Sequence, residues 1–408
     1  MNSRKSCLTT ILLFAALMAP ICLAAQEQDK QEQDQKHTNY KLVDVGTFGG
    51  PASGVNFNSI VLNNRGMVVG AATTPSPLPA HFNPLPCGPN PFVYHGFEWQ
   101  NDVVSDLGAL PGANNCSNAQ WINEKGDLAG NSENGEIDPL TGVTEIRAVL
   151  WKDGRIRNLG TLAGNHSAAS TTNNRGQVVG FAQNSIPDIY SLFDYLILFL
   201  GGDITCSSCG TETRAFLWQE GQMLDLGTLG GPDAWANAIN DRGQIVGFSY
   251  TDWTPIAGTG LPTIAPFLWD DGKMINLGSF GGHNGQAGLI NNRGQVLGTS
   301  NLPGDQSFHF FIWERGKLTD LSTPQPAGSM TIANWIDDSG EVVGALDTPG
   351  TACSTRLAGL MVCSPTSGPC LETALVRRLP VIPEVRSEVC RSHAMATPGT
   401  RSCGRRVR

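Results

Sequence analysis

One octapeptide recurs six times along the chain and constrains its fold more than any other feature. Its clearest copies are NNRGMVVG, NNRGQVVG, NDRGQIVG and NNRGQVLG at 63–70, 173–180, 240–247 and 291–298, and looser copies stand at 123–130 and 337–344. In each copy a Gly follows a polar turn and precedes a short apolar run, which predicts a tight hairpin with Gly as its left-handed residue. The predicted turn residues are Gly66, Gly126, Gly176, Gly243, Gly294 and Gly340. A phosphate-binding loop is excluded, because such a loop opens a helix rather than a strand.

Three further elements accompany the octapeptide in a fixed order. The first resembles LDLGTLGG (224–231), the second ends in Ile-Asn before the turn, as in AWANAIN (234–240), and the third is an aromatic run such as RAFLW (214–218). The first element recurs every 44 to 67 residues. Four short β-prone runs at such a period are typical of one propeller blade.

We therefore predict an all-β fold, a β-propeller built of four-stranded blades, over residues 40–353. Each blade is expected to begin with the LDLGTLGG strand and end with the aromatic strand, so that five blades are complete and a sixth lacks its last strand. A β-solenoid is the alternative. The hairpin turns argue against it, because solenoid coils are built from parallel strands.

The first 25 residues have the parts of a secretory signal peptide: a basic pair at 4–5, an apolar run at 8–23 and small residues before the expected cleavage point. An uncleaved anchor is the alternative, but the apolar run of about 16 residues is short for a membrane span. We predict cleavage, a flexible polar tether over 26–39, and a secreted, periplasmic or cell-surface protein with no stable membrane span.

Residues 354–408 differ in composition from the repeats. They carry nine Arg against three Glu and contain no Phe, Trp, Tyr, Asn, Asp, Gln or Lys. In a reading frame shifted by one nucleotide, the codons of 358–372, 381–386 and 400–404 permit three repeat elements in the right order. We interpret this basic tail as a frameshifted, disordered segment that replaces a seventh blade of an intact parent.

The four elements in their order resemble the bacterial HAF extracellular repeat family over roughly residues 40–350. This resemblance implies secretion and a β fold built from repeats, and it implies no activity or catalytic residue. The His for which the family is named is present at His95 and His309, while Arg147, Arg214 and Ala265 replace it elsewhere. That His is therefore not expected to be a ligand.

Export affects the interpretation of the cysteines, because disulfides persist outside the cytosol. Cys87 precedes the last strand of the first unit and Cys116 lies in the first loop of the second, which predicts a disulfide between adjacent blades. Cys206 and Cys209 form a CxxC pair. We interpret it as a local disulfide, because no second pair or His cluster supports a metal site.

The remaining candidates lie in loops. His166 and His283 occupy the same loop of the third and fifth units, and we interpret them as surface loop residues rather than a shared ligand or metal site. The apolar run at 191–202 predicts a helix that covers one propeller face; a docking surface for a partner or lipid is the alternative. A catalytic interpretation would use one acidic loop, with Glu133, Glu136 and Asp138.

Nearly every polar motif is repeated, which indicates a structural role for it. The sequence contains no GxSxG, HExxH or P-loop motif. We therefore predict a monomeric, secreted, non-catalytic scaffold that binds a protein or glycan, with no cofactor, metal or nucleic acid. A propeller-type glycan hydrolase or lyase, and a truncated, frameshifted product without function, are the alternatives.

Overall fold

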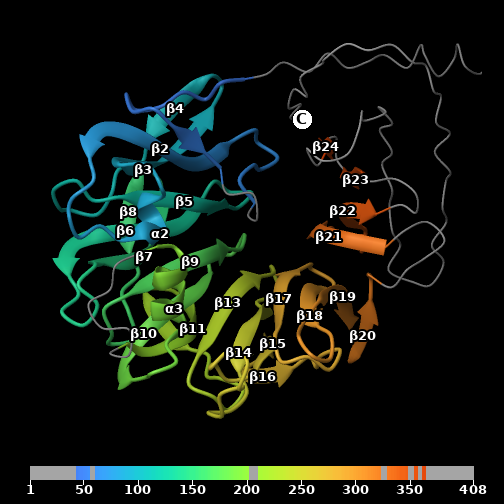
Figure 1. The fold of residues 1–408 in the computed structure, drawn as a ribbon. Coiled ribbons are helices and arrows are strands. Elements are labelled where there is room, and N and C mark those ends of the chain that lie inside the picture. Colours follow the sequence, from blue (N-terminus) through green and yellow to red (C-terminus); the bar gives the residue numbers. More distant parts are fainter. Residues whose placement is uncertain are drawn as a thin grey trace, which may run out of the picture. The chain divides into compact units, whose positions relative to one another are not determined.

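The structure is a computed structural model that describes residues 43–55, 60–201, 210–322 and 329–347, together with two short strands at 353–356 and 361–363. Six four-stranded antiparallel sheets follow one another along the chain (Figure 1). We call them blades 1 to 6, and the protein is an all-β propeller. In the part of the chain that the structure describes, no helix has the length and apolar character needed to cross a membrane.

The strands of each blade are consecutive in the chain. Blade 1 contains β1 (Ser53–Gly54), β2 (Val68–Pro77), β3 (Phe92–Gln100) and β4 (Val103–Asp106); blade 2 contains β5 (Ser117–Ile122), β6 (Leu128–Ile137), β7 (Thr144–Lys152) and β8 (Arg155–Asn158). Blade 3 contains β9 (Ser167–Thr172), β10 (Val178–Pro187), β11 (Thr211–Gln219) and β12 (Gln222–Asp225); blade 4 contains β13 (Ala234–Ile239), β14 (Ile245–Tyr250), β15 (Ile264–Asp270) and β16 (Lys273–Asn276). Blade 5 contains β17 (Gly285–Ile290), β18 (Val296–Asn301), β19 (Phe308–Glu314) and β20 (Lys317–Asp320); blade 6 contains β21 (Ser329–Ile336), β22 (Val342–Asp347), β23 (Cys353–Arg356) and β24 (Met361–Cys363). Helices α2 (Pro84–Cys87) and α3 (Leu192–Phe199) lie between the second and third strands of blades 1 and 3.

The predicted blade boundaries are wrong by one strand. Each blade begins with the strand before the octapeptide, and its fourth strand follows the aromatic run, as β8 follows β7. The cause is the two-residue turn between them, where Asp153 and Gly154 have φ of 53° and 69°. Two positive φ values define a type I′ hairpin, which pairs Lys152 with Arg155 and keeps both strands in one sheet. Most of each LDLGTLGG-like run is consequently the connection to the next blade.

The sixth blade also differs from the prediction. Strand β23 pairs with β22 and β24 pairs with β23, so this sheet has four strands. These two strands extend into residues that the sequence assigned to the basic tail. The rest of that tail, the signal peptide and the tether lie outside the described residues.

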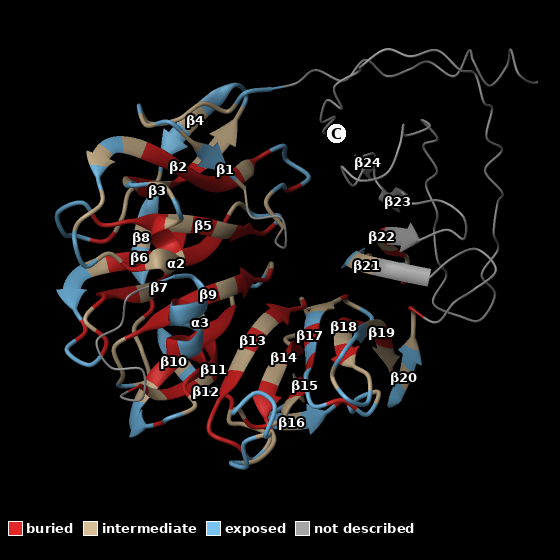
Figure 2. Cartoon of the chain, in the orientation of Figure 1, coloured by how far each residue is buried: buried red, intermediate tan, exposed pale blue. Residues whose placement is uncertain are grey.

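Successive blades pack face to face through alternating side chains. In blade 3, Val178 belongs to the apolar cluster shared with blade 2, whereas Val179 belongs to the cluster shared with blade 4. Further clusters join blades 1 and 2, 4 and 5, and 5 and 6. Figure 2 shows that the buried residues are concentrated in the middle strands of the sheets, such as β6 and β7, and are few in the fourth strands, such as β8. The apolar run of each octapeptide therefore supplies both faces of its blade.

The polar half of the octapeptide also connects the blades. Asn173 is buried; its Oδ1 accepts the N–H groups of Arg175 and Gln177, and its Nδ2 donates to the backbone oxygen of Asn240, 3.0 Å away, in the next blade. Equivalent bonds run from Asn63 to Asn123, Asn123 to Asn173, Asn240 to Asn291 and Asn291 to Asp337. We call this series the Asn ladder. All six predicted turn glycines have positive φ, between 75° and 89°.

Asn173→Ala is expected to lower the free energy of unfolding by about 2 kcal/mol, because it leaves two turn N–H groups and the Asn240 oxygen without their partner. Urea unfolding of the variant and the wild type measures the difference. Asn174→Ala is the comparison variant: its side chain is only partly buried and bonds to the Glu124 N–H and to Asp241, so we expect a smaller loss of about 1 kcal/mol. Equal losses in both variants would contradict a special role for the ladder.

Candidate functional site

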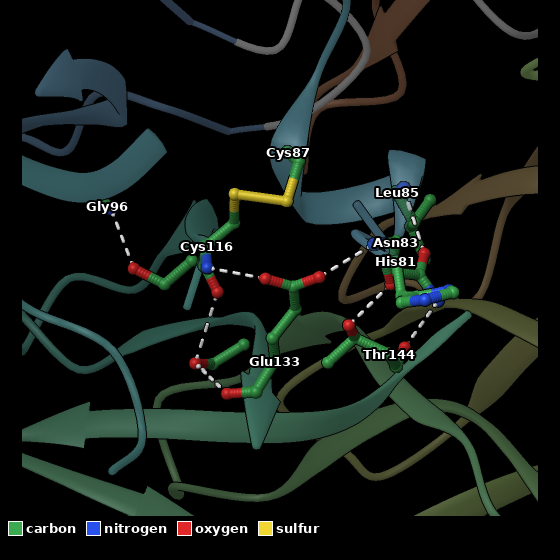
Figure 3. Close-up of a disulfide and its surroundings, with 10 residues drawn as sticks. His81, Asn83, Leu85, Cys87, Gly96, Cys116, Glu133 and Thr144 are labelled. Carbon is green, nitrogen blue, oxygen red and sulfur yellow. Dashed lines mark hydrogen bonds between the residues drawn. A yellow bond between two sulfur atoms is a disulfide. The ribbon is translucent and has the colours of Figure 1, made fainter. Parts of the chain in front are cut away.

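Several candidate residues lie either between the second and third strands of a blade or just before the first strand of the next blade. Cys87, at the end of α2, forms a disulfide with Cys116, which directly precedes β5 (Figure 3). The two Cα atoms are 5.2 Å apart. This disulfide connects blades 1 and 2, as the sequence predicted. Cys206 and Cys209 lie outside the described residues.

Glu133 lies beneath this disulfide and is fully buried. Its two carboxylate oxygens accept the N–H groups of Asn83, at 2.6 Å, and Cys116, at 2.8 Å (Figure 3). Burial raises the pKa of Glu133 to about 7, although these hydrogen bonds oppose the shift. Among the described residues, Cys87, Cys116 and Glu133 are the one group close enough to hold a metal ion. With both sulfur atoms in the disulfide, no thiolate is available, so the group is structural.

His166 connects blades 2 and 3 and is not a surface residue as predicted, because its side chain is fully buried. Its Nδ1 accepts the N–H of Ile146, so the proton lies on Nε2, which donates to Asp138 at 3.0 Å. Burial lowers the pKa of His166 against the opposing effect of Asp138, and the ring is neutral. Burial would raise the pKa of Asp138, but hydrogen bonds from His166, Thr141 and the Leu140 N–H outweigh it and lower that pKa.

His283 has a different environment from His166. Its ring is half-exposed, and Nδ1 lies 2.6 Å from Asp305 in the same blade. The two histidines thus each pair with their own aspartate. The predicted acidic loop is wrong, because Glu133 and Glu136 lie on β6 and Asp138 directly follows that strand. Glu133 and Asp138 are buried in structural contacts, while Glu136 is exposed.

A buried acidic group between blades 3 and 4 was not found from the sequence. Asp188 precedes α3, Asp194 lies on it, and Asp233 precedes β13; their exposed fractions are 3%, 3% and 0%. Asp233 accepts the N–H of Leu192, at 2.6 Å, and that of Thr213, at 2.7 Å. The available signal was positional, because Asp233 stands in its repeat where His166 and Cys116 stand in theirs.

The helix predicted within 191–202 is confirmed, since α3 spans Leu192–Phe199. Ser191 caps its N-terminus, and Phe193 and Ile197 are fully buried. The ring of Phe193 stacks on that of His166, with 4.2 Å between the ring centroids. The opposite side is exposed: Phe199 and Tyr195 have exposed fractions of 78% and 54%. One face of α3 thus covers the blades, and the other presents apolar side chains outward.

Comparisons with known proteins yield fold similarity alone. No protein-family model matches the chain, and no curated protein matches it. The β-propeller domain of the Trilobed protease from Pyrococcus furiosus is similar at a TM-score of 0.41 and 12% identity, over 74% of this chain and 80% of that one. TolB from Acinetobacter baumannii gives a TM-score of 0.37 at 12% identity, over 71% of this chain and 60% of that one. The assignment to the β-propeller fold rests on the six sheets of four consecutive strands.

Proposed function

We propose that the chain is an exported, non-catalytic member of the HAF repeat family, a propeller scaffold that binds a protein partner through α3. The observation that carries the proposal is the apolar outer face of α3. Phe199, Tyr195 and Leu198 are exposed on a helix whose other face is fixed by Phe193 and Ile197. Exposed apolar surface of this kind is typical of interaction sites, and aromatic side chains dominate the binding energy of protein interfaces.

The outer face of α3 offers apolar contact rather than charge to a partner. The described acidic residues nearest to it in the sequence, Asp188, Asp194 and Glu212, are all buried, and Glu212 lies 3.6 Å from Arg214. An apolar patch on a protein partner complements this face. Nucleic acid does not, because its binding requires basic side chains against the phosphates.

The catalytic alternative has less support. Glycan hydrolysis requires two carboxyl groups that face the substrate. Of the three predicted acids, Glu133 is occupied by two backbone N–H groups and Asp138 by His166, which leaves Glu136 exposed. Cleavage of any polysaccharide in a panel would overturn the non-catalytic proposal.

Phe199→Ser is expected to weaken partner binding at least tenfold, because it removes the most exposed aromatic ring of α3. Wild-type and variant proteins are immobilised and compared for retention of envelope proteins, each quantified by mass spectrometry. Val103→Ser is the matched control, since Val103 on β4 is 61% exposed and distant in sequence from α3.

A protein retained by the wild type and Val103→Ser but lost with Phe199→Ser supports the proposal. Equal retention by all three proteins contradicts it. Retention of glycans without protein would favour the glycan alternative, and no retained ligand of either class would favour a product without function.

A further inference from the structure

One position in the repeat connects each of three blades to the blade before it. This position directly precedes the first strand of a blade, and it contacts the loop between the second and third strands of the preceding blade. Cys116 meets Cys87 in a disulfide, and His166 donates to Asp138. Asp188 has one carboxylate oxygen that is buried with no donor beside it, and its side chain interacts with that of Asp233, which is also fully buried. The third contact thus joins two acids where the second joins a base and an acid.

The acid pair is buried and lies at the start of α3. A hydrogen bond between two carboxyl groups requires one proton, and two ionised carboxylates at this distance repel each other. Asp233 also accepts the N–H of Leu192, the first residue of α3, and the N–H of Thr213 on β11. Asp188 accepts the N–H of Tyr190 in the loop that leads into α3. The pair therefore holds the start of α3 against blade 4.

The surrounding elements supply little positive charge among the described residues. Arg214 on β11 is engaged by Glu212 at 3.6 Å and by Asp225 at 3.1 Å. His166 stacks against Phe193 and is neutral. The other titratable groups that face the pair or α3 are Asp194 on α3, Asp138 in the loop of blade 2, and Tyr250 on β14, whose hydroxyl donates to the Tyr190 oxygen. A second ionised carboxylate in the pair has no cation beside it to offset its charge.

We propose that Asp188 and Asp233 form a pH-dependent latch, which fixes α3 to blade 4 while the two carboxyls share one proton and releases α3 when both are ionised. The latch would regulate the surface that binds the partner, and to that extent it rests on the proposed function.

The direction of the pH dependence follows from burial. Burial raises the pKa of Asp233 well above its ordinary value of 3.8, raises that of Asp188, and raises that of Asp194 to about 6. A carboxyl with a raised pKa in the folded state contributes its full stability below the pKa of the unfolded chain, and loses it as pH rises through the folded value. The latch is therefore closed at acidic pH and opens as pH increases.

Hydrogen exchange of the full chain without a partner tests the latch. Between pH 5 and pH 9, the exchange rate of residues 192–199, corrected for the intrinsic effect of pH, is expected to rise at least tenfold. Strand β15 in the same spectra is the internal reference and should stay protected. Constant protection of α3 across this range would overturn the proposal, whatever a variant does.

Asp188→Asn supplies the matched variant. Its amide donates to the Asp233 carboxylate without a titratable proton, and its oxygen still accepts from Tyr190. Protection of α3 in this variant is expected to stay high at pH 9, whereas Glu136→Gln, at the exposed end of β6, should behave as the wild type. If α3 of the Asp188→Asn variant loses its protection from hydrogen exchange at the same pH as α3 of the wild type, the proposal is overturned. Because no partner is present, this outcome is separate from the result of Phe199→Ser.

Discussion

Gly180→Ala is expected to lower the free energy of unfolding by about 3 kcal/mol or more, at the upper end of the cost of overpacking. Gly180 is the last residue of an octapeptide and lies within β10. A Cβ atom there would overlap the backbone oxygen of Ala168 on β9. Backbone atoms have no alternative rotamer, so the methyl group must separate the two strands. Urea unfolding of variant and wild type measures the loss.

Gly288→Ala is the matched control for this substitution. Gly288 also lies in a strand, β17, and the atom nearest to a Cβ placed there would be the Leu297 oxygen, at an ordinary contact distance of 3.8 Å. We expect a change within about 0.5 kcal/mol there. A loss at Gly180 no larger than that at Gly288 would show that β9 and β10 can separate at little cost, which would contradict the close approach.

Loss of the disulfide is expected to have a comparable effect. Replacing Cys87 and Cys116 together with Ala removes a link across 29 residues. A loop of this length stabilises a protein by about 3–4 kcal/mol, chiefly by restricting the unfolded chain. The difference in free energy of unfolding under oxidising conditions measures the contribution.

Reduction provides an independent check on that value. A dithiol reductant should destabilise the wild type by the same amount, and the double variant much less. Equal destabilisation of both proteins by the reductant would mean that other cysteines, such as Cys206 and Cys209, carry the effect. An unchanged stability in the double variant would contradict a stabilising role for the link between blades 1 and 2.

The repeat predicted the propeller class because its signals are local. Asn-rich turns with Gly and the short apolar runs that follow them define hairpins without reference to distant residues, and positive φ at Gly176 follows from the turn alone. The disulfide was predictable too, since Cys87 and Cys116 lie at fixed places in adjacent units. The blade boundary was not, because each LDLGTLGG-like run contains the end of one strand and the connection that follows it.

Side-chain environments were harder to predict than strands. His166 is in a loop like His283, yet α3 covers it, and only the packing of Phe193 onto its ring distinguishes the two. The proton shared by Asp188 and Asp233 depends on a contact between two blades, which no single unit encodes. The role of Gly180 likewise depends on how closely β9 approaches, a tertiary distance rather than a turn preference.

The Asn ladder and the loop contacts have different consequences for how such a gene can change. Five blade boundaries share one amide-to-carbonyl contact, so a duplicated or deleted unit would find a compatible neighbour at that end of the blade. At the opposite end of the blade, Cys116, His166 and Asp233 each contact a different type of residue in the preceding blade. A unit can therefore take a given place there only if it carries the matching residue. The sixth turn begins with Asp337, which lacks the amide hydrogens of the five Asn residues. A unit added after it would therefore need one substitution before it could be joined in the same way.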